Sequence, residues 1–248
     1  MPFYEREEQI LNILSEYESI PLTALAEQLF VSLPTLRRDL IKLEHKGLIV
    51  KKYGSVSLIK NPADAQIAFA FRAEEQSTSK HLMAKRAVLE IKEGDTVMLD
   101  AATSTYFIVP YLAELKNIIV ITSGAKTALL LAQYGIPNIC TGGRMINKSF
   151  SYTGNDAIET VMRYNADIAF VSCRGLSMEG KVSDNSIEEN EVRRAMLRQS
   201  KRKVLLCDGR KLGKTYLHNL CDASDFDEII SDVPIPEHLR KPARVGNV

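Results

Sequence analysis

The 248-residue chain contains no tryptophan and few cysteines. None of the cysteines forms a C-x-x-C pair or stands at a metal-ligand spacing, which argues against a zinc module or a disulfide framework. Three of them close short apolar runs, as small buried residues often do, so we expect reduced thiols and neither a metal nor a cofactor. The cysteines are Cys140, Cys173, Cys207 and Cys221.

Long apolar segments are also missing. No run approaches the ~18 residues that a membrane span needs. The first ten residues, MPFYEREEQI, are acidic and lack the apolar core of a signal peptide. The sequence therefore predicts a cytoplasmic protein with no membrane partner.

Net charge is nearly absent, since 32 Lys and Arg face 31 Asp and Glu. The charge is nevertheless unevenly distributed. Residues 1–32 carry one cation against six acids, whereas residues 33–60 carry seven cations against two acids. Such a local excess of positive charge is a better guide to an anionic partner than the total.

The first sixty residues show three helical patterns followed by a hairpin. Apolar residues recur every three or four positions in REEQILNILSEYES and again in PLTALAEQLF. A third helix follows in LPTLRRDLIKLEHK, with Ser32 as its expected N-cap and Gly47 as its stop. LIVKKYGSVSLI alternates in strand fashion around a turn. Residues 1–59 are thus predicted to form a winged helix-turn-helix domain.

The third helix has two chemically different faces. Leu36, Leu40 and Leu43 form a stripe for burial, while Arg37 and Arg38 project toward solvent, where arginine can bind guanine edges or phosphate. The alternatives are a solvated surface or a protein-interaction module without a DNA role. The predicted DNA-binding residues are Ser32, Thr35, Arg37, Arg38, Lys42, Lys51 and Lys52.

After a connector at 60–76, residues 77–248 alternate between short apolar runs and helical patterns. Continuous apolar runs are typical of strands covered on both faces, so the second domain is predicted to be a doubly wound α/β sheet. The predicted strands are 96–100, 117–122, 137–142, 168–173, 203–207 and 228–231.

Polar and small residues gather where these strands end, which is where such sheets bind ligands. Asp100 and three following hydroxyl residues end the first strand, a glycine pair ends the third, and Lys211 follows the fifth. Together they favour a small polyol that carries a phosphate. The residues from this reasoning are Asp100, Thr103, Ser104, Thr105, Gly142, Gly143 and Lys211.

The blocks LFVSLPTLRRDLIKLEHKGLI, EGDTVMLDAATST, TGGRMI, DIAFVSCRGL, EENEVRRAM and LLCDGRKLGK resemble, in order, the DeoR family of bacterial transcriptional regulators. The resemblance implies a sensor fold akin to ribose-5-phosphate isomerase and glucosamine-6-phosphate deaminase. It also implies a repressor of sugar-metabolism genes, a sugar-phosphate effector, an operator in double-stranded DNA and a homo-oligomer, either a dimer or a tetramer.

The chain departs from that family pattern at several positions. Ala102 stands where the family usually has Gly, Ser123 where it has Asn, and Arg193 where it has Lys, while Ser55 replaces the second glycine of the hairpin. Ser123 and Arg193 join the predicted effector-binding residues through this resemblance. Because Ala102 restricts the backbone where glycine would not, the effector pocket is expected to differ in shape or to bind a less usual ligand.

An isomerase or deaminase with a fused DNA-binding head is the other hypothesis. Such enzymes need a catalytic carboxylate at the sheet edge. Here DIAFVSCRG replaces the acidic cluster that an isomerase carries after the fourth strand, and no active-site histidine is evident. Glu188, Glu189 and Glu191 remain as candidates, although they read as the start of a helix. We therefore predict a regulator rather than an enzyme.

Overall fold

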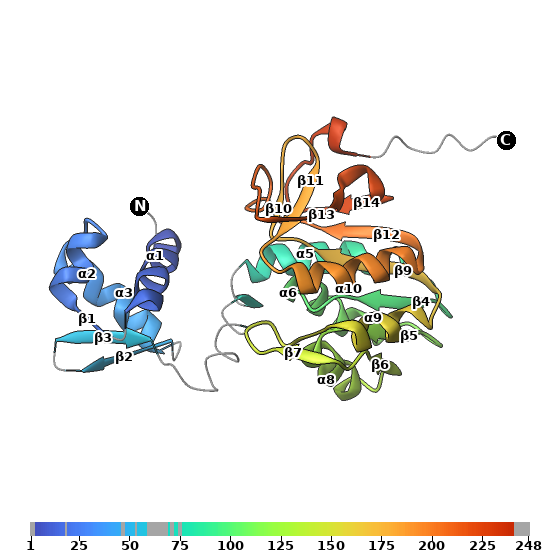
Figure 1. Cartoon of the computed structure of the whole chain (residues 1–248), viewed down its shortest axis with the longest axis horizontal. Coiled ribbons are helices and arrows are strands. Elements are labelled where there is room, and N and C mark those ends of the chain that lie inside the picture. The colour runs from blue at the N-terminus through green and yellow to red at the C-terminus, as the bar shows by residue number, and fades with distance from the viewer. Residues whose placement is uncertain are drawn as a thin grey trace. The chain divides into compact units, whose positions relative to one another are not determined.

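The computed structural model describes residues 3–17, 19–45, 48–52, 54–58, 69, 72–73 and 76–240. The chain divides into two compact units, Met1–Phe71 and Arg72–Val248. The division falls inside the predicted connector 60–76, most of which lies outside the described residues. Figure 1 shows the helices and strands of each unit.

The smaller unit has the predicted winged helix-turn-helix architecture. Three helices pack with an antiparallel sheet of order β1-β3-β2, in which β2 and β3 form the hairpin expected from the sequence. Strand β1 pairs its two residues with β3 and was not expected. The elements are α1 (Phe3–Glu16), β1 (Ile20–Pro21), α2 (Leu22–Gln28), α3 (Leu33–His45), β2 (Ile49–Lys52) and β3 (Ser55–Leu58).

The predicted leucine stripe of α3 holds this unit together. Leu36, Leu40 and Leu43 are fully buried, as their spacing of four and three residues requires. Asp39 lies on the same side and accepts two hydrogen bonds from the Arg6 guanidinium of α1, at 2.7 and 3.2 Å. Because a buried carboxylate needs a partner, this pair fixes α1 against α3.

The larger unit is a mixed α/β domain, also as predicted. All six expected strands are present and belong to one parallel sheet. The elements are α5 (Ser77–Val88), β4 (Thr96–Leu99), α6 (Thr103–Tyr106), α7 (Val109–Leu112), β5 (Ile119–Thr122), α8 (Ala125–Gln133), β6 (Asn138–Cys140), β7 (Arg144–Ile146), β8 (Ser151–Thr153), α9 (Asn155–Met162), β9 (Ala166–Ser172), β10 (Gly175–Leu176), β11 (Lys181–Asp184), α10 (Ile187–Arg198), β12 (Ser200–Leu206), β13 (His218–Asp222) and β14 (Glu228–Ile230).

The strand order of the parallel sheet determines where a ligand site can form. The order is β14-β12-β9-β4-β5-β6, so the chain moves outward in one direction from β4 and in the other from β9. The topological switch point therefore lies between β4 and β9. In doubly wound sheets, ligands bind beyond the carboxyl ends of the strands at this point.

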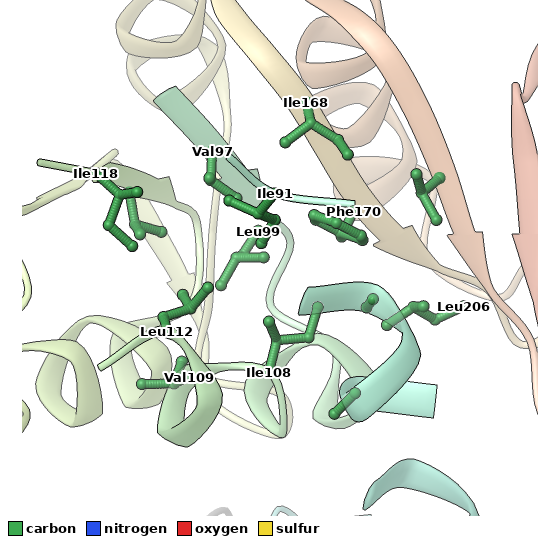
Figure 2. Packing of buried hydrophobic residues seen from close by; sticks show 14 of the residues in the cluster. Ile91, Val97, Leu99, Ile108, Val109, Leu112, Ile118, Ile168, Phe170 and Leu206 are labelled. Atoms are coloured by element: carbon green, nitrogen blue, oxygen red, sulfur yellow. The ribbon is translucent and has the colours of Figure 1, made fainter. Parts of the chain in front are cut away.

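Side chains of β4 alternate between the two faces of the sheet and belong to two separate hydrophobic clusters. Val97 and Leu99 of β4 pack on one face with residues of α5, α7 and α8, as Figure 2 shows for Leu99 and Leu112. Met98 of the same strand packs on the opposite face with α9 and α10. Both faces are covered, which explains why the strand sequences are continuously apolar.

Two smaller sheets were not expected from the sequence. Strands β7 and β8 form a short antiparallel hairpin, and β10, β11 and β13 form a second sheet with order β10-β11-β13. The strands β10 and β13 contribute few residues to a core, so their sequence lacks a clear apolar pattern. Their position brings Asp184, the last residue of β11, to the end of the parallel sheet described below.

The turn between α2 and α3 contains a strained residue. Phe30 has φ +53° and is 95% exposed, and the amides of Phe30 and Val31 bond back to the carbonyls of Glu27 and Ala26. This pattern is a Schellman motif, whose left-handed position is usually glycine. Helix α8 ends in the same motif with Gly135 at that position.

We expect Phe30→Gly to stabilise the smaller unit by about 0.5–1 kcal/mol. A non-glycine residue in the left-handed conformation costs about 1–2 kcal/mol, and glycine removes this cost. The gain exceeds the ~0.4–1 kcal/mol of stability that glycine loses by raising the conformational entropy of the unfolded chain. Hydrogen exchange at the amides of α2 in the full chain measures this change. Gly135→Ala is the matched control and should destabilise the larger unit. Faster exchange in Phe30→Gly would contradict the prediction.

Candidate functional site

The start of α3 is built as the sequence predicts. The hydroxyl of Ser32 caps the helix by accepting the amide of Thr35 at 3.4 Å, and the two hydroxyls are 2.8 Å apart. Pro34 occupies the first turn, where its missing amide hydrogen costs nothing. The cap fixes the beginning of the helix and therefore the direction in which its next residues point.

The outer face of α3 carries an exposed cationic surface. Arg37, Arg38 and Lys42 are all exposed, and Thr35 is half-buried beside them. Ile41 is 46% exposed between the arginines and Lys42, which sequence reasoning did not note. An apolar side chain on such a face can contact the methyl group of thymine. We call Thr35, Arg37, Arg38, Ile41 and Lys42 the outer face of α3.

The hairpin supplies a further cation, but it is already paired. The ammonium of Lys51 lies 2.6 Å from the Glu44 carboxylate, which joins β2 to the end of α3. A phosphate would have to compete with Glu44 for this group. Lys52 is in β2, and its side chain lies outside the described residues.

In the larger unit, Asp100 follows β4 and stands at the switch point. It is 1% exposed, and its two carboxylate oxygens accept four hydrogen bonds. One oxygen accepts the Ala102 amide at 3.1 Å and the Thr105 hydroxyl at 2.8 Å. The other accepts the Ser172 amide of β9 at 3.0 Å and the Arg193 guanidinium at 2.8 Å. A carboxylate has about four acceptor positions, so Asp100 is fully used in holding β4 and β9 together.

Arg193 of α10 is the centre of this arrangement. Its guanidinium is buried and donates to three carboxylates, Asp100 at 2.8 Å, Asp184 at 3.0 Å and Glu189 at 3.2 Å, and to the Asn190 amide oxygen at 3.0 Å. Burial acts to lower the pKa of Arg193, but the carboxylates hold it above its ordinary value. We call Asp100, Asp184, Glu189 and Arg193 the carboxylate cluster.

Beside this cluster lies a second group of polar side chains. The ammonium of Lys211 donates to the hydroxyls of Ser104 at 3.2 Å and Ser172 at 2.9 Å, and lies 3.2 Å from the Asp208 carboxylate. Ser172 connects the two groups, because its amide bonds to Asp100. We call Lys211, Ser104, Ser172 and Asp208 the lysine cluster.

Cations outnumber the carboxylate around Asp208 of the lysine cluster. Burial acts to raise the pKa of Asp208, but the charges of Lys211, Arg210 and Lys80 bring it below its ordinary value. Burial acts to lower the pKa of Lys211, and the Asp208 carboxylate raises it above the usual range. One carboxylate is thus surrounded by several cations, and this arrangement favours an additional anion.

The hydroxyls that follow Asp100 do not all face the same way. Thr105 is fully buried and directs its hydroxyl to Asp100 and the Ala102 carbonyl, so its role is local. Ser104 faces Lys211, and Thr103 is 9% exposed at the start of α6. Helix α6 has only four residues, and the Ala102 amide before it is occupied by Asp100. Side chains, rather than the dipole of α6, therefore provide the polar groups at this position.

The glycine pair and Ser123 stand farther along the same edge. A Cβ on Gly143 would lie 2.7 Å from the Thr153 carbonyl, and its φ is +99°, so glycine is required by the packing of β8. Gly142 has φ +67° with open space around it. Ser123 is buried at the end of β5, where its carbonyl accepts the Tyr152 amide at 2.7 Å.

Several residues of the two clusters were missed or given another role. Asp184 and Asn190 had no sequence signal. The position of β11 and the side of α10 that faces the interior are decided by tertiary packing. Asp208 follows the fifth predicted strand but was not among the predicted effector-binding residues, and Glu189 was considered only as a catalytic candidate. Within the described parts of the chain, no group of three or more His, Cys, Asp or Glu could hold a metal ion. No helix there is long and apolar enough to span a membrane.

A winged helix-turn-helix with a cationic outer face and a separate α/β unit with a polar site define a DNA-binding regulator with a sensor domain. Comparison with known families agrees. Residues 6–61 match the DeoR-like helix-turn-helix domain, and residues 75–233 match the DeoR C terminal sensor domain. The chain belongs to the DeoR family of transcriptional regulators, as its sequence blocks indicated.

Relatives match over nearly the full length. The HTH-type transcriptional regulator GolR of Listeria innocua is 30% identical over 96% of this chain and 94% of its own. A putative aga operon transcriptional repressor of Escherichia coli O157:H7 is 30% identical over 96% of this chain and 90% of its own.

Solved structures resemble this chain at low sequence identity. The eIF2B delta protein of Chaetomium thermophilum is 15% identical, with a TM-score of 0.50 over 69% of this chain and 62% of its own. The ribose 5-phosphate isomerase a of Methanocaldococcus jannaschii is 19% identical, with a TM-score of 0.41 over 54% of this chain and 53% of its own.

We expect Arg193→Lys to destabilise the larger unit by about 1–3 kcal/mol. A lysine keeps the charge but has one nitrogen, so it cannot reach all the carboxylates that the planar guanidinium joins, and one is left poorly paired. Urea unfolding followed by circular dichroism measures the loss. Arg198→Lys at the exposed end of α10 is the matched control. Equal stability of the two variants would show that the cluster does not depend on the arginine geometry.

Proposed function

We propose that this regulator binds operator DNA by placing the outer face of α3 in the major groove. The observation that carries the proposal is the exposure of Arg37 and Arg38 on a helix whose opposite side is buried and whose start is capped. Arginine on such a face can bond guanine bidentately or bind phosphate. Two such units in a homo-oligomer would read two half-sites one helical turn apart.

The effector that we propose is a phosphorylated sugar. The lysine cluster offers hydroxyls and a lysine whose side chain is 20% exposed, with further cations nearby, which suits a phosphate. The adjoining carboxylate cluster offers Glu189, whose side chain is 13% exposed and accepts hydrogen bonds as sugar hydroxyls require. Asp100 and Thr105 support this site indirectly, because their polar groups already bond to each other and to other protein groups.

The regulated genes that we propose are those of sugar metabolism, with repression as the mode. The name of the putative aga operon repressor supports repression, because this chain resembles that protein over nearly its full length. A protein that binds an operator acts in the compartment that holds the DNA, which agrees with the expected cytoplasmic location.

Catalysis by the sensor unit has less support. Its buried carboxylates are ion-paired with Arg193, and although burial acts to raise the pKa of Asp184, Arg193 brings it below the ordinary value. A carboxylate with a lowered pKa is a weak base at neutral pH. Glu191 pairs with Arg194, and Glu188 lies 3.8 Å from Arg144. These contacts favour a binding role over an isomerase or deaminase.

For DNA binding, we expect the double variant Arg37→Ala/Arg38→Ala to lose about 10- to 100-fold in affinity for the DNA upstream of its own gene. The slope of log K against log salt should also fall by about 0.9 for each phosphate contact removed. Fluorescence anisotropy at several salt concentrations measures both quantities. Lys85→Ala/Arg86→Ala, an adjacent exposed pair in α5, is the control. Unchanged affinity in the first variant would refute α3 as the reading helix.

For effector binding, we expect a sugar phosphate to raise the melting temperature of the full chain by about 5 °C or more at a hundredfold excess over Kd. Lys211→Met should abolish this shift, because it removes the ammonium from the lysine cluster. A thermal-shift screen of sugar phosphates and their unphosphorylated sugars measures it.

Lys214→Met is the control for that screen, since Lys214 is exposed and follows Lys211 by three residues. It should behave as the wild-type chain does. Equal shifts from phosphorylated and unphosphorylated sugars would contradict a phosphate subsite. A shift that survives Lys211→Met would place the subsite elsewhere.

A further inference from the structure

Two buried cysteines stand side by side at the carboxyl end of the parallel sheet. Strands β9 and β12 are neighbours, and their last paired residues are Ser172 and Leu206, where the serine hydroxyl donates to the leucine carbonyl at 2.7 Å. Cys173 and Cys207 come next in the same register, and the Cys207 amide still bonds within the sheet, to the Ile230 carbonyl at 3.0 Å. Both cysteines belong to one hydrophobic cluster, so their thiols lie on the same face of the sheet.

This placement meets the geometric requirement for a disulfide. Neighbouring strands lie about 4.7–4.9 Å apart, and the Cα atoms that a disulfide joins lie about 4.4–6.8 Å apart. The two thiols also contact each other, since Cys173 has a side-chain hydrogen bond with Cys207. Both are free thiols in the structure. Closing the bond therefore needs an oxidant and only a small adjustment of the strand ends.

The surroundings of the pair make Cys173 the thiol that reacts first. The hydrogen bond with Cys207 lowers the pKa of Cys173, and the charges of Lys211 and Arg193 act in the same direction against burial. The pKa of Cys207 is raised by its contact with Cys173 and by burial. Cys173 is 5% exposed, whereas Cys207 is fully buried. Because the thiolate is the reactive form, an oxidant attacks Cys173 before Cys207.

We infer that Cys173 and Cys207 form a redox-sensitive dithiol that a peroxide closes to a disulfide. The Cys173 thiolate attacks one peroxide oxygen, the O–O bond breaks, and the departing hydroxide takes up a proton to become water, which leaves a sulfenic acid. The Cys207 sulfur then attacks the Cys173 sulfur, the S–O bond breaks, and the departing hydroxide takes the Cys207 proton. Two thiols are oxidised to one disulfide, and one peroxide is reduced to two waters.

The consequence of the bridge rests on the proposed sugar-phosphate site, because both cysteines adjoin the lysine cluster. Ser172 precedes Cys173 and Asp208 follows Cys207, and the Lys211 ammonium lies 2.9 Å from the Ser172 hydroxyl and 3.2 Å from the Asp208 carboxylate. A disulfide brings the two sulfurs to about 2.05 Å, closer than two thiols in contact. The strand ends then move, and Ser172 and Asp208 move with them. Oxidation therefore weakens effector binding.

The dithiol is tested by treating the full chain with hydrogen peroxide, alkylating the remaining thiols and mapping the peptides by mass spectrometry without reduction. We expect a Cys173–Cys207 cross-link that a dithiol reductant reverses, with Cys140 and Cys221 alkylated. Cys207→Ala should stop at a sulfenic acid on Cys173, which dimedone captures. Cys221→Ala is the matched control and should form the bridge as wild type does. A cross-link between other cysteines, or none in wild type, would overturn the inference whether or not the variants fold.

The effect on the sensor is measured with the sugar phosphate that gives the largest thermal shift. Its Kd for the bridged wild-type chain should be about fivefold or more above that for the reduced chain. Cys173→Ala, which lacks the thiol that reacts first, should keep its Kd after the same peroxide treatment. An unchanged Kd in a fully bridged chain would overturn the regulatory effect. A chain that forms the bridge but binds no sugar phosphate would overturn the proposed effector and leave the dithiol standing.

Discussion

The architecture of the sensor unit depends on compensating one buried positive charge. The guanidinium of Arg193 lies in the interior, where an unpaired charge would be far too costly. Its donors are met by Asp100 after β4, Asp184 at the end of β11, and Glu189 one turn earlier in α10. Elements distant in sequence must therefore converge on one point. That point is the switch point of the parallel sheet, where this fold places its ligands.

This pairing also separates two chemical environments at the sheet edge. The three carboxylates share the guanidinium of Arg193 and accept its hydrogen bonds. Lys211 bonds to the hydroxyl of Ser172, whose amide bonds to Asp100, and the Lys211 side chain is 20% exposed. A ligand with hydroxyls at one end and a phosphate at the other would match both environments.

Much of the fold was predictable because local patterns suffice to specify it. Segments of four to six residues with apolar side chains at their centre marked every strand of the parallel sheet, and the spacing of Leu36, Leu40 and Leu43 marked the buried side of α3. The small sheet β10-β11-β13 was missed, because its strands are short and partly polar. Phe30 was also missed as the left-handed residue of the turn, since glycine is the usual signal for that conformation.

By itself, the sequence determined the two-part organisation, the family, and the identity of α3 as a capped helix with exposed arginines. These properties follow from periodicity, charge and motif order, all of which are local. Only the tertiary structure decided that Asp100 is saturated by four hydrogen bonds and that Arg193 joins three carboxylates. Such contacts depend on strand order and on the register of packed elements, which bring together residues that no sequence spacing relates.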